Sequence, residues 1–311
     1  MSDKKPPKKF QVQERPKTMK VVNNSLADDL FDMNVDDFKK LLAGENRKFR
    51  EASKTKHGAI ESKYWLKYLD EADDSIKIAR PLDEYDRDIL NACITAQDLG
   101  NEVITATGIW RIITGNNDAE PTESIKKEIL DRVDRMSITR LIVDTTDAHD
   151  AGIYAPETKI KLKSVLLPCE VIECEINGQL VDAAVVFTKS SPLLRIARAH
   201  VGKKKNVAQI LSYPLELLEV KGQRNTPTTT AIKNYIVRRV ENAKKHPSQQ
   251  RSILFSTLFA RCGLADADRF KRREYRKIAE DVMNSLVEKK EISAFELVKE
   301  QGEFIKITFS F

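Results

Sequence analysis

The chain has 311 residues, with 53 Lys or Arg against 47 Asp or Glu, so its formal net charge at pH 7 is +6. This length corresponds to about two domains, and 41% hydrophobic with 32% charged residues is typical of helices with charged faces. No apolar run reaches the ~18 residues of a membrane span, and four scattered cysteines favour a reducing, cytoplasmic location without a membrane partner.

The first 80 residues divide into two parts of opposite charge. Residues 1–25 carry seven Lys or Arg, two acidic residues and three prolines, which predicts a disordered basic arm. This arm either contacts nucleic acid or keeps the chain in solution. Residues 26–80 open with an acidic segment at 28–37 and predict an extension of amphipathic helices, at about 26–52 and 61–72. These helices either dock on the next domain or bind a partner.

Residues 81–220 form the first predicted domain. A helix begins after Pro81 and ends at Gly100, and a short extended stretch follows. A second helix has Thr105 as its N-cap and Gly115 as its stop, and a third opens at Thr122 or Glu123. Asn177-Gly178 predicts a type I′ turn between two strands. The order helix, short strand, helix, helix, hairpin is that of a winged helix-turn-helix.

Residues 227–311 repeat this order. Helices are predicted at about 228–245, 251–261 and 268–289, and a hairpin turns at Gln301-Gly302. The fold class predicted for the chain is therefore α+β and mainly helical, with two winged helix-turn-helix domains in tandem behind the N-terminal extension.

The sequence offers no recognisable catalytic motif. It lacks a phosphate-binding P-loop, a G-x-S-x-G elbow and an H-E-x-x-H helix, and its four histidines stand apart. Cys169 and Cys174 are five residues apart on a predicted strand, so they should lie on opposite faces. Residues 145–150 form a polar turn. We therefore expect no enzyme, no catalytic residue, no metal and no cofactor.

The strongest local signal is a basic run at the start of the last predicted helix. It has a net charge of +5 within residues 269–277, and its cationic members are Arg269, Lys271, Arg272, Arg273, Arg276 and Lys277. Tyr275, Val282 and Leu286 mark the apolar side. Arg273, Arg276 and Lys277 then point outward with Arg269 beside them, and Lys271 and Arg272 flank the apolar side, as a DNA-recognition helix requires. The alternative is a solvated basic face. The hairpin adds Lys299 and Lys306 as DNA contacts.

The corresponding helix of the first domain differs in charge. Its basic residues alternate with acidic ones, so the charges nearly cancel. We expect this helix to bind DNA weakly, and its domain to serve dimerisation or an auxiliary contact.

Several segments resemble plasmid-type replication initiators of the tandem winged-helix class, as carried on mobile elements of Gram-positive bacteria. They are PLDEYDRDILNA at 81–92, GNEVITATGIWR at 100–111, SPLLRIA at 191–197, and Asn225-Thr with YIVRRV at 235–240. The resemblance covers about 81–311. It implies a non-enzymatic initiator that binds repeated origin sites in double-stranded DNA, is associated with the nucleoid, and forms a dimer through its first domain. The main recognition helix then falls on 268–289.

Three other hypotheses remain open. The first is a winged-helix transcriptional regulator without origin function. The second is a nuclease or ligand-binding enzyme with a site around 144–150. The third is an adaptor whose acidic segment 28–37 recruits a partner such as a host helicase or its loader.

Overall fold

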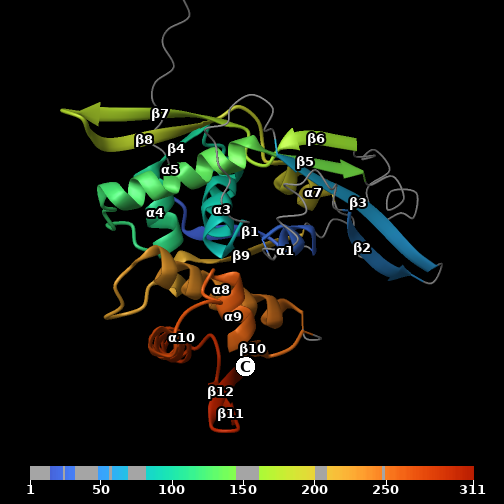
Figure 1. Ribbon diagram of the computed structural model, residues 1–311, viewed down its shortest axis with the longest axis vertical. Coiled ribbons are helices and arrows are strands. Elements are labelled where there is room, and N and C mark those ends of the chain that lie inside the picture. The colour runs from blue at the N-terminus through green and yellow to red at the C-terminus, as the bar shows by residue number, and fades with distance from the viewer. Residues whose placement is uncertain are drawn as a thin grey trace, which may run out of the picture.

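The structure is a computed structural model, and it describes residues 15–23, 25–31, 48–55, 58–68, 82–144, 161–199, 209–246 and 249–311. Its strands form four antiparallel sheets in these ranges, so the fold is a mixture of helices and sheets and less helical than predicted. Figure 1 shows one group of helices with a hairpin in the upper half of the molecule and a second such group below it. None of the described helices is both long and apolar enough to cross a membrane.

The upper group contains the predicted elements of the first unit in their predicted order. They are α3 (Glu84–Asp98), β4 (Val103–Thr105), α4 (Ala106–Thr114), α5 (Glu123–Ile138), β7 (Cys169–Ile176) and β8 (Gln179–Phe187). Thr105 caps α4 and Gly115 ends it with a φ of 72°, both as expected. Of the two predicted starts of the third helix, Thr122 is the N-cap of α5 and Glu123 its first residue. Asn177 and Gly178 both have positive φ, as a type I′ turn requires.

The lower group repeats this arrangement. Its elements are α8 (Pro227–Lys245), β10 (Ser252–Leu254), α9 (Phe255–Arg261), α10 (Arg269–Glu288), β11 (Ala294–Glu300) and β12 (Glu303–Ser310). The sheet order is β10-β12-β11 here and β4-β8-β7 in the first unit, so a short strand pairs with the second hairpin strand in both. The predicted repeat of element order is confirmed.

Part of the predicted disordered arm is a strand instead. β1 (Thr18–Val22) pairs antiparallel with β9 (Ile210–Pro214), which continues into the short 3-10 helix η1 (Leu215–Leu218). Met19, Val21 and Val22 are fully buried. For residues 15–23 the prediction of disorder is wrong, because an alternation of apolar and polar residues favours a half-buried strand even where lysines are dense. Residues 1–14 lie outside the described part of the chain.

The acidic extension is also corrected. α1 (Ser25–Phe31) is helical and docks on the first unit through Ala27, Leu30 and Phe31, as expected. Residues 48–55 and 58–68, however, form strands β2 (Lys48–Thr55) and β3 (Gly58–Tyr68) rather than helices. They join β5 (Thr139–Asp144) and β6 (Lys161–Val165) in a sheet of order β2-β3-β5-β6. The aromatic residues of β3 favour a strand, and periodicity alone distinguishes such short segments poorly.

The two units share one continuous hydrophobic core. α3 packs on α8, and α7 (Pro192–Ala199) lies between β6 and β1. Asn234 on α8 donates a hydrogen bond to the carbonyl of Ile113 at 2.8 Å. The buried Arg238 of α8 pairs with Glu84 of α3 at 2.5 Å. The two predicted domains, 81–220 and 227–311, thus pack against each other, and their boundaries stay predictions from the sequence.

Candidate nucleic-acid interface

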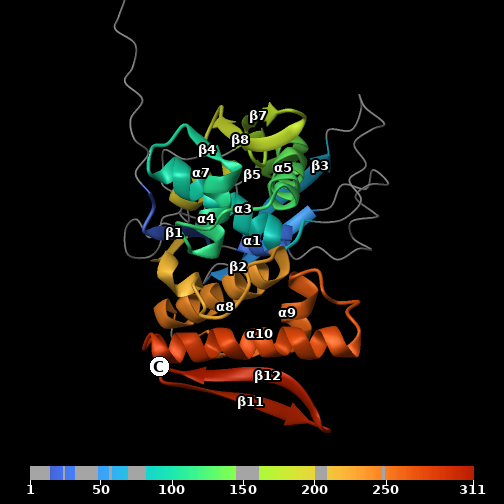
Figure 2. The ribbon, with the colours of Figure 1, turned by 90° about the vertical axis from the view of Figure 1, so that its left-hand side faces the viewer.

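Helix α10 is the element that carries the predicted basic run. Its N-cap is Asp268, whose carboxylate accepts a hydrogen bond from the backbone N–H of Lys271 at 2.9 Å. The buried side of the helix consists of Ile278, Ala279, Val282, Met283, Ser285 and Leu286. Figure 2 shows α10 between α8 and the β11–β12 hairpin, with one long side open toward the viewer. The apolar stripe thus fixes which side of α10 faces solvent.

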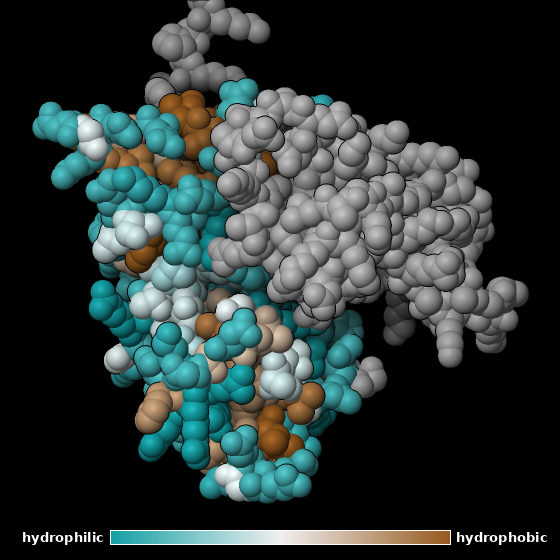
Figure 3. Space-filling view, in the orientation of Figure 1, coloured by the Kyte–Doolittle hydropathy of each residue, from teal (hydrophilic) through white to brown (hydrophobic). Residues whose placement is uncertain are grey.

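The structure brings the six cations of α10 together on its first turns. Arg269, Lys271, Arg272, Arg273 and Lys277 are exposed, and Arg276 is half-buried. Arg269, Lys271 and Arg273 make no hydrogen bond or ion pair through their side chains with any residue that the structure describes. Their charges are available to a ligand. The surface around α10 is predominantly hydrophilic in Figure 3.

The other three cations have partners within the chain. Arg272 donates to the backbone carbonyl of Ala265 at 2.6 Å, and Arg276 donates to the carbonyl of Arg272 at 3.1 Å. Lys277 pairs with Asp281 at 2.8 Å, and this contact raises the pKa of its ammonium group. These three side chains are therefore weaker candidates for direct contact than Arg269, Lys271 and Arg273.

The two hairpin lysines lie on different faces. Lys299 follows Leu297 by two residues along β11, so both share the sheet face that packs on the core, and Lys299 lies 4.3 Å from the ring centre of Phe304. Lys306 precedes the fully buried Ile307 in β12 and therefore occupies the opposite face. Figure 2 places the hairpin turn at the same end as the start of α10. Lys299 is exposed and Lys306 is half-buried, and the role of both lysines as DNA contacts stays a prediction.

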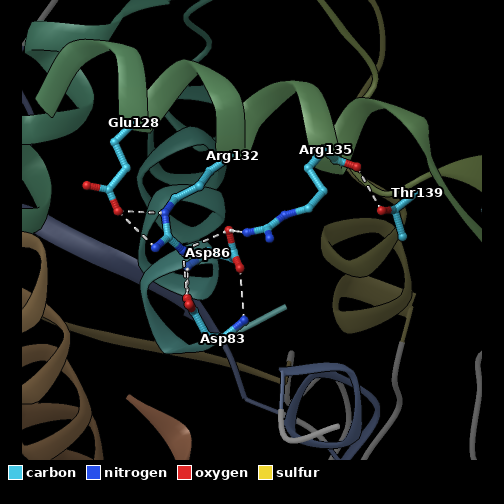
Figure 4. Close-up of polar contacts among 6 residues, drawn as sticks. All are labelled: Asp83, Asp86, Glu128, Arg132, Arg135 and Thr139. Atoms are coloured by element: carbon cyan, nitrogen blue, oxygen red, sulfur yellow. Dashed lines mark hydrogen bonds and ion pairs between the residues drawn. The ribbon is translucent and has the colours of Figure 1, made fainter. Parts of the chain in front are cut away.

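The basic residues of α5 have a different environment. Arg132 pairs with Asp83 at 2.8 Å, with Asp86 at 3.1 Å and with Glu128 at 3.0 Å (Figure 4). Arg135 pairs with Asp86 as well. The same two aspartates form the capping box at the N-terminus of α3. The arginines therefore join α5 to the start of α3 rather than facing solvent.

This ion-pair cluster is largely buried. Only 6% of the Arg132 side chain is exposed, and the Asp86 side chain is fully buried. Burial disfavours the charged form of Arg132, but Asp86 and Asp83 outweigh it and raise the pKa of the guanidinium above its ordinary value. The remaining cations of α5 are also engaged, since Lys126 contacts the Val181 carbonyl and Lys127 pairs with Glu123 at 2.8 Å. The near-zero net charge of α5 in the sequence therefore did not show which groups its cations contact in the fold.

A second ion-pair cluster, in which two buried arginines meet a partly exposed carboxylate, was not predicted from the sequence. Arg87 on α3 pairs with Asp28 on α1 at 2.6 Å, and Arg238 on α8 lies 3.6 Å from the same carboxylate. Burial raises the pKa of Asp28, but these two guanidinium groups outweigh it, and the net pKa lies below its ordinary value. Nothing in the spacing of these residues along the chain indicated that they would meet.

Phe270 is a further residue of α10 that was not predicted from the sequence to be functional. It lies between Arg269 and Lys271, and it is 85% exposed. Its position off the apolar stripe of α10 was the available signal.

The remaining predictions concern the polar turn at 145–150, the cysteines and metal binding. Residues 145–150 lie outside the described ranges. Cys169 is half-buried and Cys174 is exposed, and both are free thiols. Among the residues that the structure describes, no three His, Cys, Asp or Glu side chains gather in a way that could hold a metal ion.

No protein-family model matches the chain, and no curated protein matches it in sequence. Among solved structures, a crystal structure of domains 2 and 3 of RctB is similar to this chain. The alignment covers 86% of this chain and 93% of the RctB chain, at 11% sequence identity and a TM-score of 0.32. At this TM-score the similarity shows neither a shared fold nor a shared function.

Proposed function

We propose that this chain is a sequence-specific binding protein for double-stranded DNA, and that the open side of the first half of α10 is its contact surface. The observation that carries the proposal is that Arg269, Lys271 and Arg273 are exposed and lack a side-chain partner in the described residues. Arg269 and Arg273 lie on the side of α10 opposite its buried stripe, and Lys271 lies on the stripe side, one to two turns before the first buried residue, Ile278.

The chemistry of duplex DNA matches this surface. A major groove admits an α-helix, and an arginine can donate two hydrogen bonds to O6 and N7 of guanine. Arg269 and Arg273 are one turn apart on α10, so both can reach base edges from one groove. Lys271, and Lys299 on the hairpin, can pair with phosphates on either side. Three helices with a sheet of order β10-β12-β11 support a winged-helix arrangement for this unit.

The biological role that we propose is initiation of replication of a plasmid or mobile element at repeated origin sites. It rests on the sequence resemblance of residues 81–311 to tandem winged-helix initiators. In this proposal the first unit contacts a second copy of the chain or a host helicase or loader, because the basic residues of its third helix, α5, are already engaged within the chain. The chain then acts by binding and not as an enzyme.

The test is a titration of the full-length chain with a labelled duplex that flanks its own gene, at salt concentrations from 50 to 200 mM. About 5–8 phosphate contacts predict that log affinity falls with log salt with a slope of about −5 to −7. Arg273→Ala should weaken the preferred site more than unrelated DNA. Binding that ignores both salt and sequence would refute the proposal.

A second measurement addresses the role in replication. A plasmid that carries the flanking DNA but no initiator of its own should replicate only in cells that supply the chain, and not when they supply Arg273→Ala. Direct repeats in the protected DNA agree with an initiator. A single palindrome, together with a failure to support replication, would instead identify a transcriptional regulator.

A further inference from the structure

We propose that Phe270 reads a thymine: its ring contacts the C5-methyl group of a thymine in the major groove, next to a guanine bound by Arg273. The inference rests on the proposed function and adds to it a residue that determines specificity.

The exposure of Phe270 is the first observation. It is 85% exposed, whereas Ile172, the next in this respect among the large apolar residues that the structure describes, is 58% exposed. A phenylalanine ring that stays in water adds almost nothing to folding stability, since the gain of about 1.5–3 kcal/mol comes only on burial. Single exposed apolar residues are nevertheless common, so exposure alone assigns no role.

The position of Phe270 supplies the second observation. Its direct neighbours are Arg269 and Lys271, both exposed, and Arg273 lies one turn further on the same side of the helix. It belongs to the first turn of α10, whose N-cap is Asp268. Residues at this end of a recognition helix are those that contact base edges. An apolar ring between cationic side chains fits a ligand that has an apolar group with negative charges on either side of it.

In the major groove of a DNA duplex, one chemical group can be the apolar group that the ring contacts. The thymine methyl is the apolar group that the major groove presents, and phenylalanine is among the side chains that contact it. Residues three apart on a helix are separated by about 4.5 Å along its axis, and neighbouring base pairs by about 3.4 Å. A guanine under Arg273 thus places the thymine under Phe270 one or two base pairs away.

The experiment removes only the methyl group. The full-length chain first selects its preferred duplex from a random-sequence library. Each thymine of that duplex is then replaced by deoxyuridine, and affinities are measured for the unchanged chain, Phe270→Ala and Arg273→Ala. We expect one uracil position that weakens the unchanged chain about fourfold, the equivalent of one buried methyl group. Phe270→Ala should bind thymine and uracil duplexes equally.

The controls separate this inference from the function on which it rests. Arg273→Ala should weaken binding to both duplexes by one factor and keep the fourfold difference. Phe311→Ala changes another exposed aromatic residue, packed beside Phe309 and Arg251, and should also keep it. If the chain selects no duplex, the proposed function fails.

Two results would overturn the role of Phe270 alone. In the first, a duplex is selected and Arg273 matters, but no thymine responds to uracil. In the second, Phe270→Ala weakens binding equally on every sequence, which would show stacking rather than reading of a methyl group.

Discussion

The third helices of the two units, α5 and α10, use the same residue types for different purposes. In α5, Arg132 and Arg135 pair with Asp86, a buried capping residue of α3. In α10, Arg269 and Arg273 extend from the open side and meet no partner in the described part of the chain. One pair of arginines fixes the packing of a unit, and the other is available to a ligand.

This difference shows that the number of charges on a helix says little about its function. What matters is whether carboxylates from another element lie within reach. The N-terminus of α3 supplies two of them to α5, whereas α10 packs against α8 through a side that is mainly apolar. Each of the following predictions changes one side of the comparison.

The largest effect is expected for Arg132→Ala. It leaves the carboxylates of Asp83 and Asp86 buried with less positive charge, which should lower the free energy of unfolding by about 3–5 kcal/mol. Urea denaturation of the full chain measures this loss. Arg273→Ala is the matched control, because an exposed side chain without partners should change stability by less than about 0.5 kcal/mol.

DNA affinity should show the reverse pattern. Arg273→Ala should cost about 1–3 kcal/mol of binding free energy at the preferred site, and Arg132→Ala, measured where it is folded, should cost little. Equal losses of affinity from the two variants would show that the division between α5 and α10 is wrong.

A buried cation without a carboxylate partner should make the free energy of unfolding depend on pH. Lys233 on α8 donates to Oδ1 of Asn225 at 2.6 Å, and burial lowers its pKa from 10.5 to about 8. The unfolded chain therefore binds one more proton than the folded chain between about pH 8 and pH 10.5. Stability should rise across this window by about 3 kcal/mol and lack this contribution at neutral pH.

The measurement compares the unchanged chain with Lys233→Met from pH 7 to 10.5. The difference between their unfolding free energies should change only above about pH 8, because Lys233 begins to lose its proton in the folded chain there. A difference that is constant with pH would mean that Lys233 keeps its proton in the folded state.

The smallest effect concerns two lysines of α10. Lys271 has no partner among the described residues, and Lys277 pairs with Asp281 at 2.8 Å. Lys271→Gln should therefore reduce the salt dependence of DNA binding by about one unit of slope, and Lys277→Gln by less. Asp281→Asn should raise affinity slightly. If both lysine variants lower the slope equally, the ion pair with Asp281 opens in the complex.

Much of the fold could be read from local signals. Thr105 identified one helix start, Thr122 or Glu123 located another to within one residue, Gly115 identified a stop, and Asn177-Gly178 identified a hairpin, because caps and turns depend on residues close in sequence. The same holds for the basic side of α10, since its apolar stripe has helical period.

The segments that were predicted wrongly depend on partners far along the chain. β1 is a strand because β9, nearly 200 residues later, pairs with it, and β3 lies between β2 and β5.

The sequence by itself determined where helices begin and end and which side of α10 is polar, because capping and periodicity act over a few residues. Only the tertiary structure decided which arginines are free, because an ion pair needs a carboxylate that packing brings within about 4 Å. Arg132 and Arg273 look alike in the sequence, and the position of α3 beside α5 makes the first structural and leaves the second for a ligand.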